Sequence, residues 1–138
     1  MTGGEKAALV VGGVAGAGLL AYVGYRLITS GPPTINGRSF SAWVIECGGL
    51  MKTQGYTYSN RAQDQNLPCV RVINYMLATI GYSRSPYNVS GRSADFSSNT
   101  ESAIKAFQAA QGLASTGIVD YATFMALIQA YDAATKQG

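Results

Sequence analysis

The feature that most constrains this sequence is a stretch of 19 residues, 7–25, that has no charged side chain and contains 14 hydrophobic ones. As an α-helix it would span about 28 Å, close to the ~30 Å hydrocarbon core of a bilayer. Lys6 precedes the stretch and Arg26 follows it, which is typical of the flanks of a membrane helix. We therefore expect a retained single-pass anchor over residues 1–28, while the basic residues on its two flanks leave its orientation open.

Glycines in this stretch follow a helical spacing. Gly12, Gly16 and Gly24 are separated by multiples of four residues, and small residues at that spacing let a second membrane helix approach closely. The expected partners are therefore the lipid bilayer and other membrane helices or assembly subunits. A cleaved secretory signal is the competing interpretation. It is disfavoured because Lys6 stands beside a glutamate and no Ala-x-Ala site follows the stretch.

The composition excludes several function classes. The chain contains no histidine, which removes Ser-His-Asp and Cys-His catalysis and the commonest zinc ligand. The net charge of +3 comes from basic residues scattered along the chain, a pattern that does not favour a nucleic-acid partner. We expect no catalytic residues, no metal and no cofactor.

A proline- and glycine-rich linker is expected over residues 29–38, because proline removes backbone donors and restricts the residue before it. Residues 39–66 should then form a short helix and a polar loop that pack on the following domain. The helix is expected from Ser39 to Met51, with Ser39 or Ser41 as its cap. Its apolar face would contain Phe40, Trp43, Val44 and Cys47.

The two cysteines, Cys47 and Cys69, are 22 positions apart. In an oxidising compartment a disulfide between them would stabilise the fold by about 3 kcal/mol. Two buried free thiols are the alternative, and the sequence leaves both open.

Three amphipathic patterns follow, over Leu67–Ile80, Asn99–Gln111 and Asp120–Thr135. The second opens with a capping-box pattern from Ser98 to Glu101 and stops at Gly112. Three short amphipathic helices can bury one another's apolar faces, so the sequence predicts an all-α fold with a small three-helix domain over residues 67–138.

The spacing of particular residues in this domain follows a known pattern. The first helix and its end supply Val70, Leu77, Gly81 and Tyr82. The second supplies Phe96, Thr100, Ala103, Ile104, Phe107 and Gln108, and the third supplies Gly112, Leu113, Gly117, Val119, Thr123, Ala126 and Leu127. In this register residues 67–130 resemble the peptidoglycan-binding domain family, a three-helix module found beside many cell-wall hydrolases. The sequence departs from that pattern at Ser93-Ala94, Thr116 and Asp120.

The resemblance implies peptidoglycan as a partner. A polymeric sugar–peptide would be bound in a shallow groove of aromatic rings and amides. Tyr82, Tyr87, Gln108 and Tyr121 stand near loops and helix starts, and they are the expected ligand-binding residues. Phe96 is expected in the core.

The function that follows is a membrane-anchored, non-catalytic peptidoglycan-binding or tethering protein, as a possible subunit of an envelope-spanning assembly. One alternative is a structural membrane protein of a lipid-containing bacteriophage virion. A less favoured alternative is a lytic enzyme, because the sequence around Glu46 loosely resembles the setting of a catalytic acid in lytic transglycosylases.

Overall fold

The computed structural model describes residues 32–137. The expected anchor over residues 1–28, with Gly12, Gly16 and Gly24, lies outside the described residues. Among the helices of residues 32–137, none has the length and apolar character needed to cross a bilayer. The regular elements of this part of the chain are helices, with two isolated bridges in its loops, which confirms the all-α class for the described residues.

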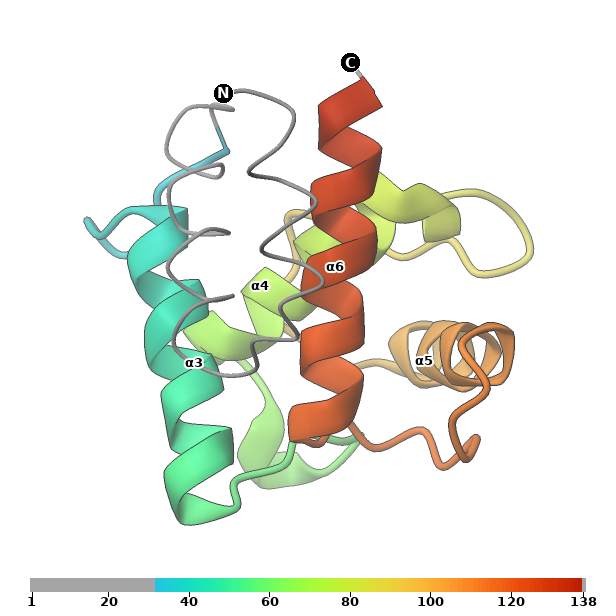
Figure 1. Cartoon of the computed structure of the whole chain (residues 1–138), viewed down its shortest axis with the longest axis horizontal. Coiled ribbons are helices and arrows are strands. Elements are labelled where there is room, and N and C mark those ends of the chain that lie inside the picture. Colours follow the sequence, from blue (N-terminus) through green and yellow to red (C-terminus); the bar gives the residue numbers. More distant parts are fainter. Residues whose placement is uncertain (1–31, 138) are drawn as a thin grey trace, which may run out of the picture.

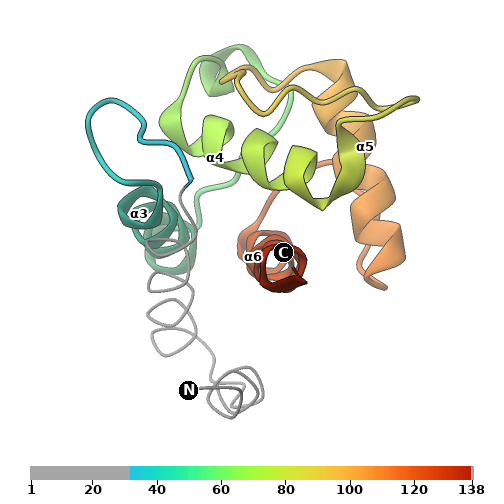
Figure 2. The same ribbon diagram turned by 90° about the horizontal axis from the view of Figure 1, so that it is seen from above.

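The fold is built from α-helices arranged around one core (Figures 1 and 2). Helices α3 and α6 run antiparallel beside each other, α4 crosses behind them, and α5 lies on the side of α6 away from α3. Two short turns supplement them, a 3₁₀ turn called η1 and a π turn called η2. The bounds are α3 Phe40–Gln54, η1 Ala62–Asp64, α4 Pro68–Leu77, η2 Ala78–Tyr82, α5 Ser98–Ala110 and α6 Tyr121–Gln137.

Helix α3 forms where a serine cap precedes an apolar stripe. The Ser39 hydroxyl accepts a hydrogen bond from the Ala42 amide at 3.2 Å, as the sequence predicts. The helix continues past Met51 and ends at Gly55, whose φ of +70° suits glycine. Its buried side chains are Phe40, Ser41, Val44, Cys47 and Met51. Trp43, which was expected on this face, is only partly buried.

The caps of the later helices differ in one place from the prediction. Ser97, and not Ser98, caps α5, because its hydroxyl accepts a hydrogen bond from the Thr100 amide at 3.1 Å. Asp120 caps α6 by accepting from the Thr123 amide at 2.9 Å. The family pattern has glycine at this position, and the aspartate instead satisfies an amide at the start of α6.

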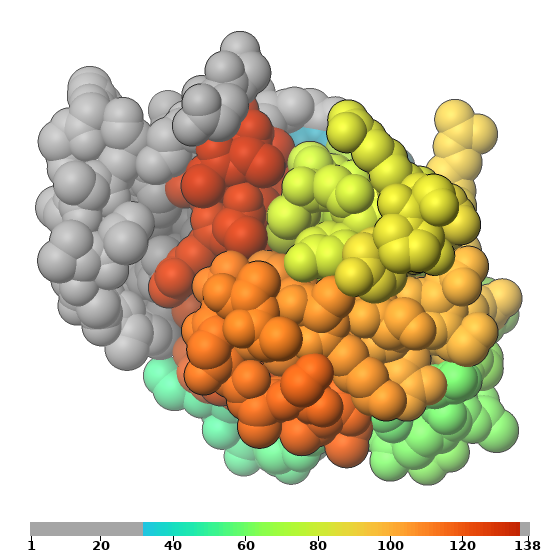
Figure 3. Space-filling model, turned by 90° about the vertical axis from the view of Figure 1, so that its right-hand side faces the viewer, coloured from blue at the N-terminus to red at the C-terminus, as the bar shows by residue number. Residues whose placement is uncertain are grey.

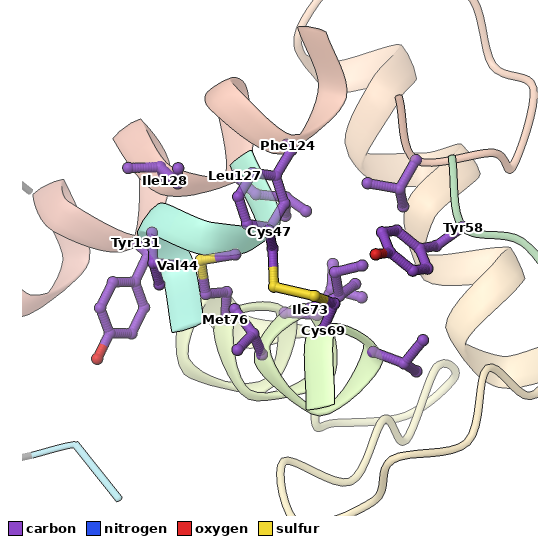
Figure 4. Packing of buried hydrophobic residues seen from close by; sticks show 14 of the residues in the cluster. Val44, Cys47, Tyr58, Cys69, Ile73, Met76, Phe124, Leu127, Ile128 and Tyr131 are labelled. Carbon is purple, nitrogen blue, oxygen red and sulfur yellow. A yellow bond between two sulfur atoms is a disulfide. The ribbon is translucent and has the colours of Figure 1, made fainter. Parts of the chain in front are cut away.

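The core joins α3 to the predicted three-helix domain (Figure 4). Cys47 on α3 and Cys69 on α4 form a disulfide, so of the two alternatives the structure has the bridged one. Around it lie Val44, Ile73, Met76, Phe124, Leu127, Ile128 and Tyr131. Phe96 is also fully buried, as expected.

Part of the expected linker is folded against the domain. Ile35 and Arg38 exchange two backbone hydrogen bonds of 2.9 and 3.0 Å around a turn at Asn36-Gly37. Ile35 is buried, and its carbonyl oxygen accepts a hydrogen bond from the Trp43 indole at 2.8 Å. Asn-Gly is a strong signal for this kind of tight turn, because both residues adopt positive φ. The folded region therefore begins before residue 39.

Candidate functional site

Two of the expected ligand-binding residues, Tyr82 and Tyr87, lie together. Their ring centroids are 5.1 Å apart in an edge-to-face arrangement, and Tyr82 also meets Phe107 of α5 at 6.5 Å. Both tyrosines are partly buried against the core. Figure 3 shows this side of the molecule, with α5 at its centre and the end of α4 and the loop after it above. The ring contacts attach that loop to α5.

Gln108 has a different role from the one expected. Its side chain is buried, its Nε2 donates to the Ile118 carbonyl at 2.9 Å and to Thr123 Oγ1 at 3.0 Å, and its Oε1 accepts from the Gly117 amide at 2.9 Å. These bonds hold the turn between α5 and α6 together. Because its amide is committed inside the protein, we do not assign Gln108 to a ligand-binding surface.

Tyr121 begins α6 and is partly buried. Its hydroxyl is enclosed and has no hydrogen-bond partner among the described residues. Since Tyr82 and Tyr87 pack at the end of α4 while Tyr121 starts α6, the structure does not gather the expected residues into one surface.

A groove of about 550 Å³ lies elsewhere, between α3 and the segment that joins it to α4. We call it the aromatic groove. Its rings and apolar side chains are those of Trp43, Leu50, Tyr56, Tyr58, Leu67 and Pro68. Its polar side chains are those of Glu46, Gln54, Arg61, Gln63 and Asp64.

The tyrosines of the groove form a stacked pair. The rings of Tyr56 and Tyr58 are nearly parallel, with 9° between their planes and 6.1 Å between their centroids. Tyr58 is 4% exposed, whereas Tyr56 is 50% exposed. The buried Tyr58 ring therefore lies beside the exposed one, and Tyr56 presents its ring to solvent.

Two arginine–carboxylate pairs include side chains that line the groove, namely Glu46, Arg61 and Asp64. Arg38 donates to Glu46 Oε1 at 2.7 Å, and its guanidinium carbon lies 4.3 Å from the centre of the Trp43 ring. Arg61 Nε donates at 2.7 Å to Oδ2 of Asp64, which is buried. Charge-assisted hydrogen bonds of this kind fix side-chain positions, so Glu46, Arg61 and Asp64 each have a partner that orients them.

Long-range hydrogen bonds and the disulfide connect the wall of the groove to the rest of the domain. Tyr58 exchanges backbone hydrogen bonds of 3.0 and 2.8 Å with Val119, just before α6. The Gln65 side chain accepts from the Phe96 amide at 2.8 Å and donates to the Phe96 carbonyl at 3.1 Å. The disulfide adds a third tie at Cys69, which itself lines the groove. A pre-organised wall lowers the entropic cost of binding.

The Tyr58 hydroxyl remains protonated at neutral pH. Burial is the main cause that raises the pKa of Tyr58 above its usual 10.0, and the nearby Tyr56, Asp64 and Glu46 raise it further. A neutral phenol both donates and accepts hydrogen bonds.

Sequence reasoning missed this groove because it treated residues 53–66 as a polar loop. The signal was present in Tyr56-Thr57-Tyr58, since residues two apart in an extended segment point to the same side. What the pattern did not reveal is that Trp43, counted as a core residue, would line the same surface.

Comparisons with known proteins place part of the chain in a family. Neither the comparison with curated proteins nor that with solved structures finds a match. Residues 67–127, from the residue before α4 into α6, match the family model described as "Putative peptidoglycan binding domain". This match supports the resemblance over α4, α5 and the first part of α6.

Proposed function

We propose that this protein is a non-catalytic, membrane-anchored peptidoglycan-binding protein that contacts the glycan through the aromatic groove. One observation carries the proposal: the groove lies against a domain that matches the peptidoglycan-binding family, and Leu67, Pro68 and Cys69 belong to both. The ligand-contacting surface thus combines the family domain with the preceding residues 43–66.

The chemistry of the groove suits a sugar. A pyranose ring has apolar C–H faces that pack on aromatic rings, and equatorial hydroxyl or acetamido groups that need hydrogen-bond partners. Tyr56 offers an exposed ring, while Gln54 and Gln63 offer amides that both donate and accept. N-acetylated hexosamines, the units of the glycan strand, present both kinds of group.

The proposal that the protein binds the glycan without cleaving it depends on the role of Glu46. A catalytic acid in glycoside hydrolysis must be protonated, which requires a desolvated carboxyl. The Glu46 side chain is 44% exposed and accepts a hydrogen bond from Arg38 at 2.7 Å, so the carboxyl is not desolvated. We therefore propose that Glu46 accepts hydrogen bonds from a sugar and does not protonate a glycosidic oxygen.

The proposed location is outside the cytoplasm, attached to a membrane. The disulfide between Cys47 and Cys69 supports an oxidising compartment, and the uncharged residues 7–25 support the anchor. We expect the full chain to stay with the membrane pellet during alkaline extraction. Release into the supernatant would contradict the anchor and leave the glycan-binding proposal standing.

Co-sedimentation with purified peptidoglycan sacculi tests the binding function. We expect the full chain to pellet with sacculi, and Tyr56→Ala to lower the bound fraction by about tenfold because it removes the exposed ring. Thermal unfolding of the variant checks that the fold is kept, as expected for a residue that is 50% exposed. Turbidity of the sacculi should stay constant during long incubation, and clearing would establish lytic activity.

Two matched controls make the result specific. Ile118→Ala removes another exposed hydrophobic side chain and should leave binding unchanged. Tyr87→Ala removes a ring of the pair that was first expected to bind, and it should also leave binding unchanged. No pelleting of the wild-type chain above a non-binding protein would overturn the proposed function, and equal loss in Tyr56→Ala and Tyr87→Ala would overturn its assignment to the groove.

A further inference from the structure

A second hollow surface lies on the other side of the start of α4 and is built around two arginines. Arg71 of α4 and Arg92 of the loop before α5 line two adjoining cavities, of about 500 and 270 Å³. Besides these arginines the larger cavity is lined by Pro33, Tyr75, Ala78 and Thr79. The smaller one is lined by Asn36, Asn66, Leu67 and Pro68. We call the two cavities together the arginine trough.

The arginines of the trough differ from Arg61, which lines the aromatic groove. Arg61 pairs with the Asp64 carboxylate at 2.7 Å on the wall of the aromatic groove. Within residues 32–137, neither Arg71 nor Arg92 forms an ion pair with a carboxylate. Two cations lining one cavity repel each other, and an anion between them would remove that repulsion.

The loop that carries Arg92 is held firmly against α4. Buried Asn74 donates its side-chain amide to the Ser93 carbonyl at 2.9 Å. Gly91 permits a close approach, since a Cβ at that position would lie 3.3 Å from the Cβ of Ala78. The backbone around Arg92 is therefore fixed relative to the helix that carries Arg71.

The trough and the aromatic groove meet at the start of α4. Leu67 and Pro68 line both the smaller cavity of the trough and the aromatic groove. A ligand that occupies both surfaces must therefore join a sugar to an anionic group within a short distance. In peptidoglycan, short peptides with free carboxylates branch from the sugars of the glycan strand, and they meet this requirement.

We infer that Arg71 and Arg92 bind a carboxylate of the peptidoglycan stem peptide while the aromatic groove holds the sugar that carries it. This inference rests on the proposed function. The planar guanidinium groups match a carboxylate through paired hydrogen bonds. Tyr75 and Ala78 provide an apolar surface for the alanine methyl groups of the peptide, and Asn36 and Asn66 provide amides for its backbone.

The test is calorimetric titration of the full chain with a synthetic stem tripeptide, L-Ala-γ-D-Glu-L-Lys, and with the same peptide after amidation of its carboxylates. We expect the free peptide to bind at least about tenfold more tightly than the amidated one, because each lost charge-assisted bond weakens binding by about that factor. R71Q and R92Q should each lower the affinity about tenfold. R71K keeps the charge without the planar fork, and it should lower the affinity by less.

R84Q is the matched control, since Arg84 is an exposed arginine that lines neither cavity, and it should bind like the wild type. Thermal unfolding of every variant verifies the fold. Equal affinity for the free and the amidated peptide, or wild-type affinity in both R71Q and R92Q, would overturn the inference. So would inorganic phosphate that binds through these arginines while the tripeptide does not, because the trough would then serve a phosphate anion.

Sacculus binding separates this inference from the proposed function. If the wild type pellets with sacculi but binds no tripeptide, the stem-peptide subsite is wrong and glycan binding through the aromatic groove stands. If the wild type neither pellets nor binds tripeptide, both are wrong. If R71Q and R92Q also lower the fraction bound to sacculi, while R84Q does not, the trough acts on the intact polymer.

Discussion

Polar and aromatic side chains have opposite roles in two regions of the molecule. One region is residues 67–127, which match the peptidoglycan-binding family, and the other is residues 32–66, which precede them. In the matched region Gln108 is buried and bonded to its own turn, and Tyr82 packs on Phe107. In the preceding region Tyr56 is half exposed and Glu46 faces a groove. The matched region uses Gln108 and Tyr82 for folding, whereas residues 32–66 present Tyr56 and Glu46 to solvent.

This difference separates the evidence for a fold from the evidence for a binding surface. A family pattern collects residues that the fold requires, such as the caps and turn residues around Gln108 and Thr123. It does not follow that the same residues touch a ligand. Here the surface with binding chemistry is formed where α3 and residues 55–66 meet the matched region, and so it depends on both parts.

The conclusion that the binding surface depends on both regions would be wrong if residues 32–66 folded independently of the matched region. Phe40→Ala tests this and has the largest expected effect. Phe40 is 1% exposed and its ring lies 5.1 Å from that of Tyr75 on α4 and 5.9 Å from that of Tyr131 on α6. Removing it should lower the free energy of unfolding by about 3–5 kcal/mol, measured by urea denaturation.

Ile45→Ala is the control on the same helix, because Ile45 is 46% exposed and its loss should change stability by no more than about 0.5 kcal/mol. Circular dichroism and tyrosine fluorescence should report one common transition for Phe40→Ala. Two separate transitions, with only the first shifted, would show that α3 is an appendage.

The disulfide is the covalent link between the two regions, and its removal gives the next largest effect. The double substitution Cys47→Ala with Cys69→Ala opens a loop of 22 positions, which is expected to lower the free energy of unfolding by about 3 kcal/mol. Reduction of the wild-type protein should have a similar effect. If neither change alters the urea midpoint, the hydrogen bonds at Tyr58 and Gln65 hold the regions together without the bridge.

The sequence predicts the helices well where apolar residues recur at helical spacing. The apolar residues Phe124, Leu127, Ile128 and Tyr131 recur at helical spacing, and all are buried. Helix ends were less exact, because Ser97 and Ser98 are equivalent in the pattern and only the geometry of the Thr100 amide selects Ser97. The cysteine pairing was one of two open alternatives for the same reason: spacing alone does not fix the distance between two side chains.

The binding surface was not predictable by local pattern. The aromatic groove depends on the contact between Gln65 and Phe96, 31 positions apart, and on the pairing of Tyr58 with Val119. No periodicity in the sequence connects such positions. The sequence also did not distinguish a structural role of Gln108 from a binding role, since both call for a polar residue beside a turn; the structure places the Gln108 side chain in the interior.

The Gln108→Ala variant tests whether a residue needed for folding is also needed for binding. It would leave the buried Gly117 amide without its partner, and the expected loss of stability is about 2 kcal/mol. Well below the midpoint of unfolding, this variant should still bind sacculi like the wild type, whereas Tyr56→Ala should lose binding and keep stability. A Gln108→Ala variant of normal stability that fails to bind would return Gln108 to the ligand-binding surface.

The smallest expected effect is a decrease in the free energy of unfolding at alkaline pH, caused by one tyrosine in each region. Burial is the main cause that raises the pKa of Tyr58, in residues 32–66, and of Tyr82, in residues 67–127, above the usual 10.0. A raised pKa means that the folded state holds the phenol proton more tightly than the unfolded state. The stabilisation is therefore complete below about pH 10 and is lost as the pH rises above it.

Urea denaturation across this range should show the free energy of unfolding falling with pH. Tyr58→Phe and Tyr82→Phe should each make the fall less steep, because phenylalanine has no proton to lose, and the double variant should flatten it further. Tyr58 has neighbouring carboxylates among the causes of its raised pKa, whereas Tyr82 has only burial and Tyr87. Added salt should therefore screen part of the effect at Tyr58 and little of it at Tyr82. Equal salt dependence at the two residues would contradict the placement of Tyr58 in a polar groove and remove the contrast between the two regions.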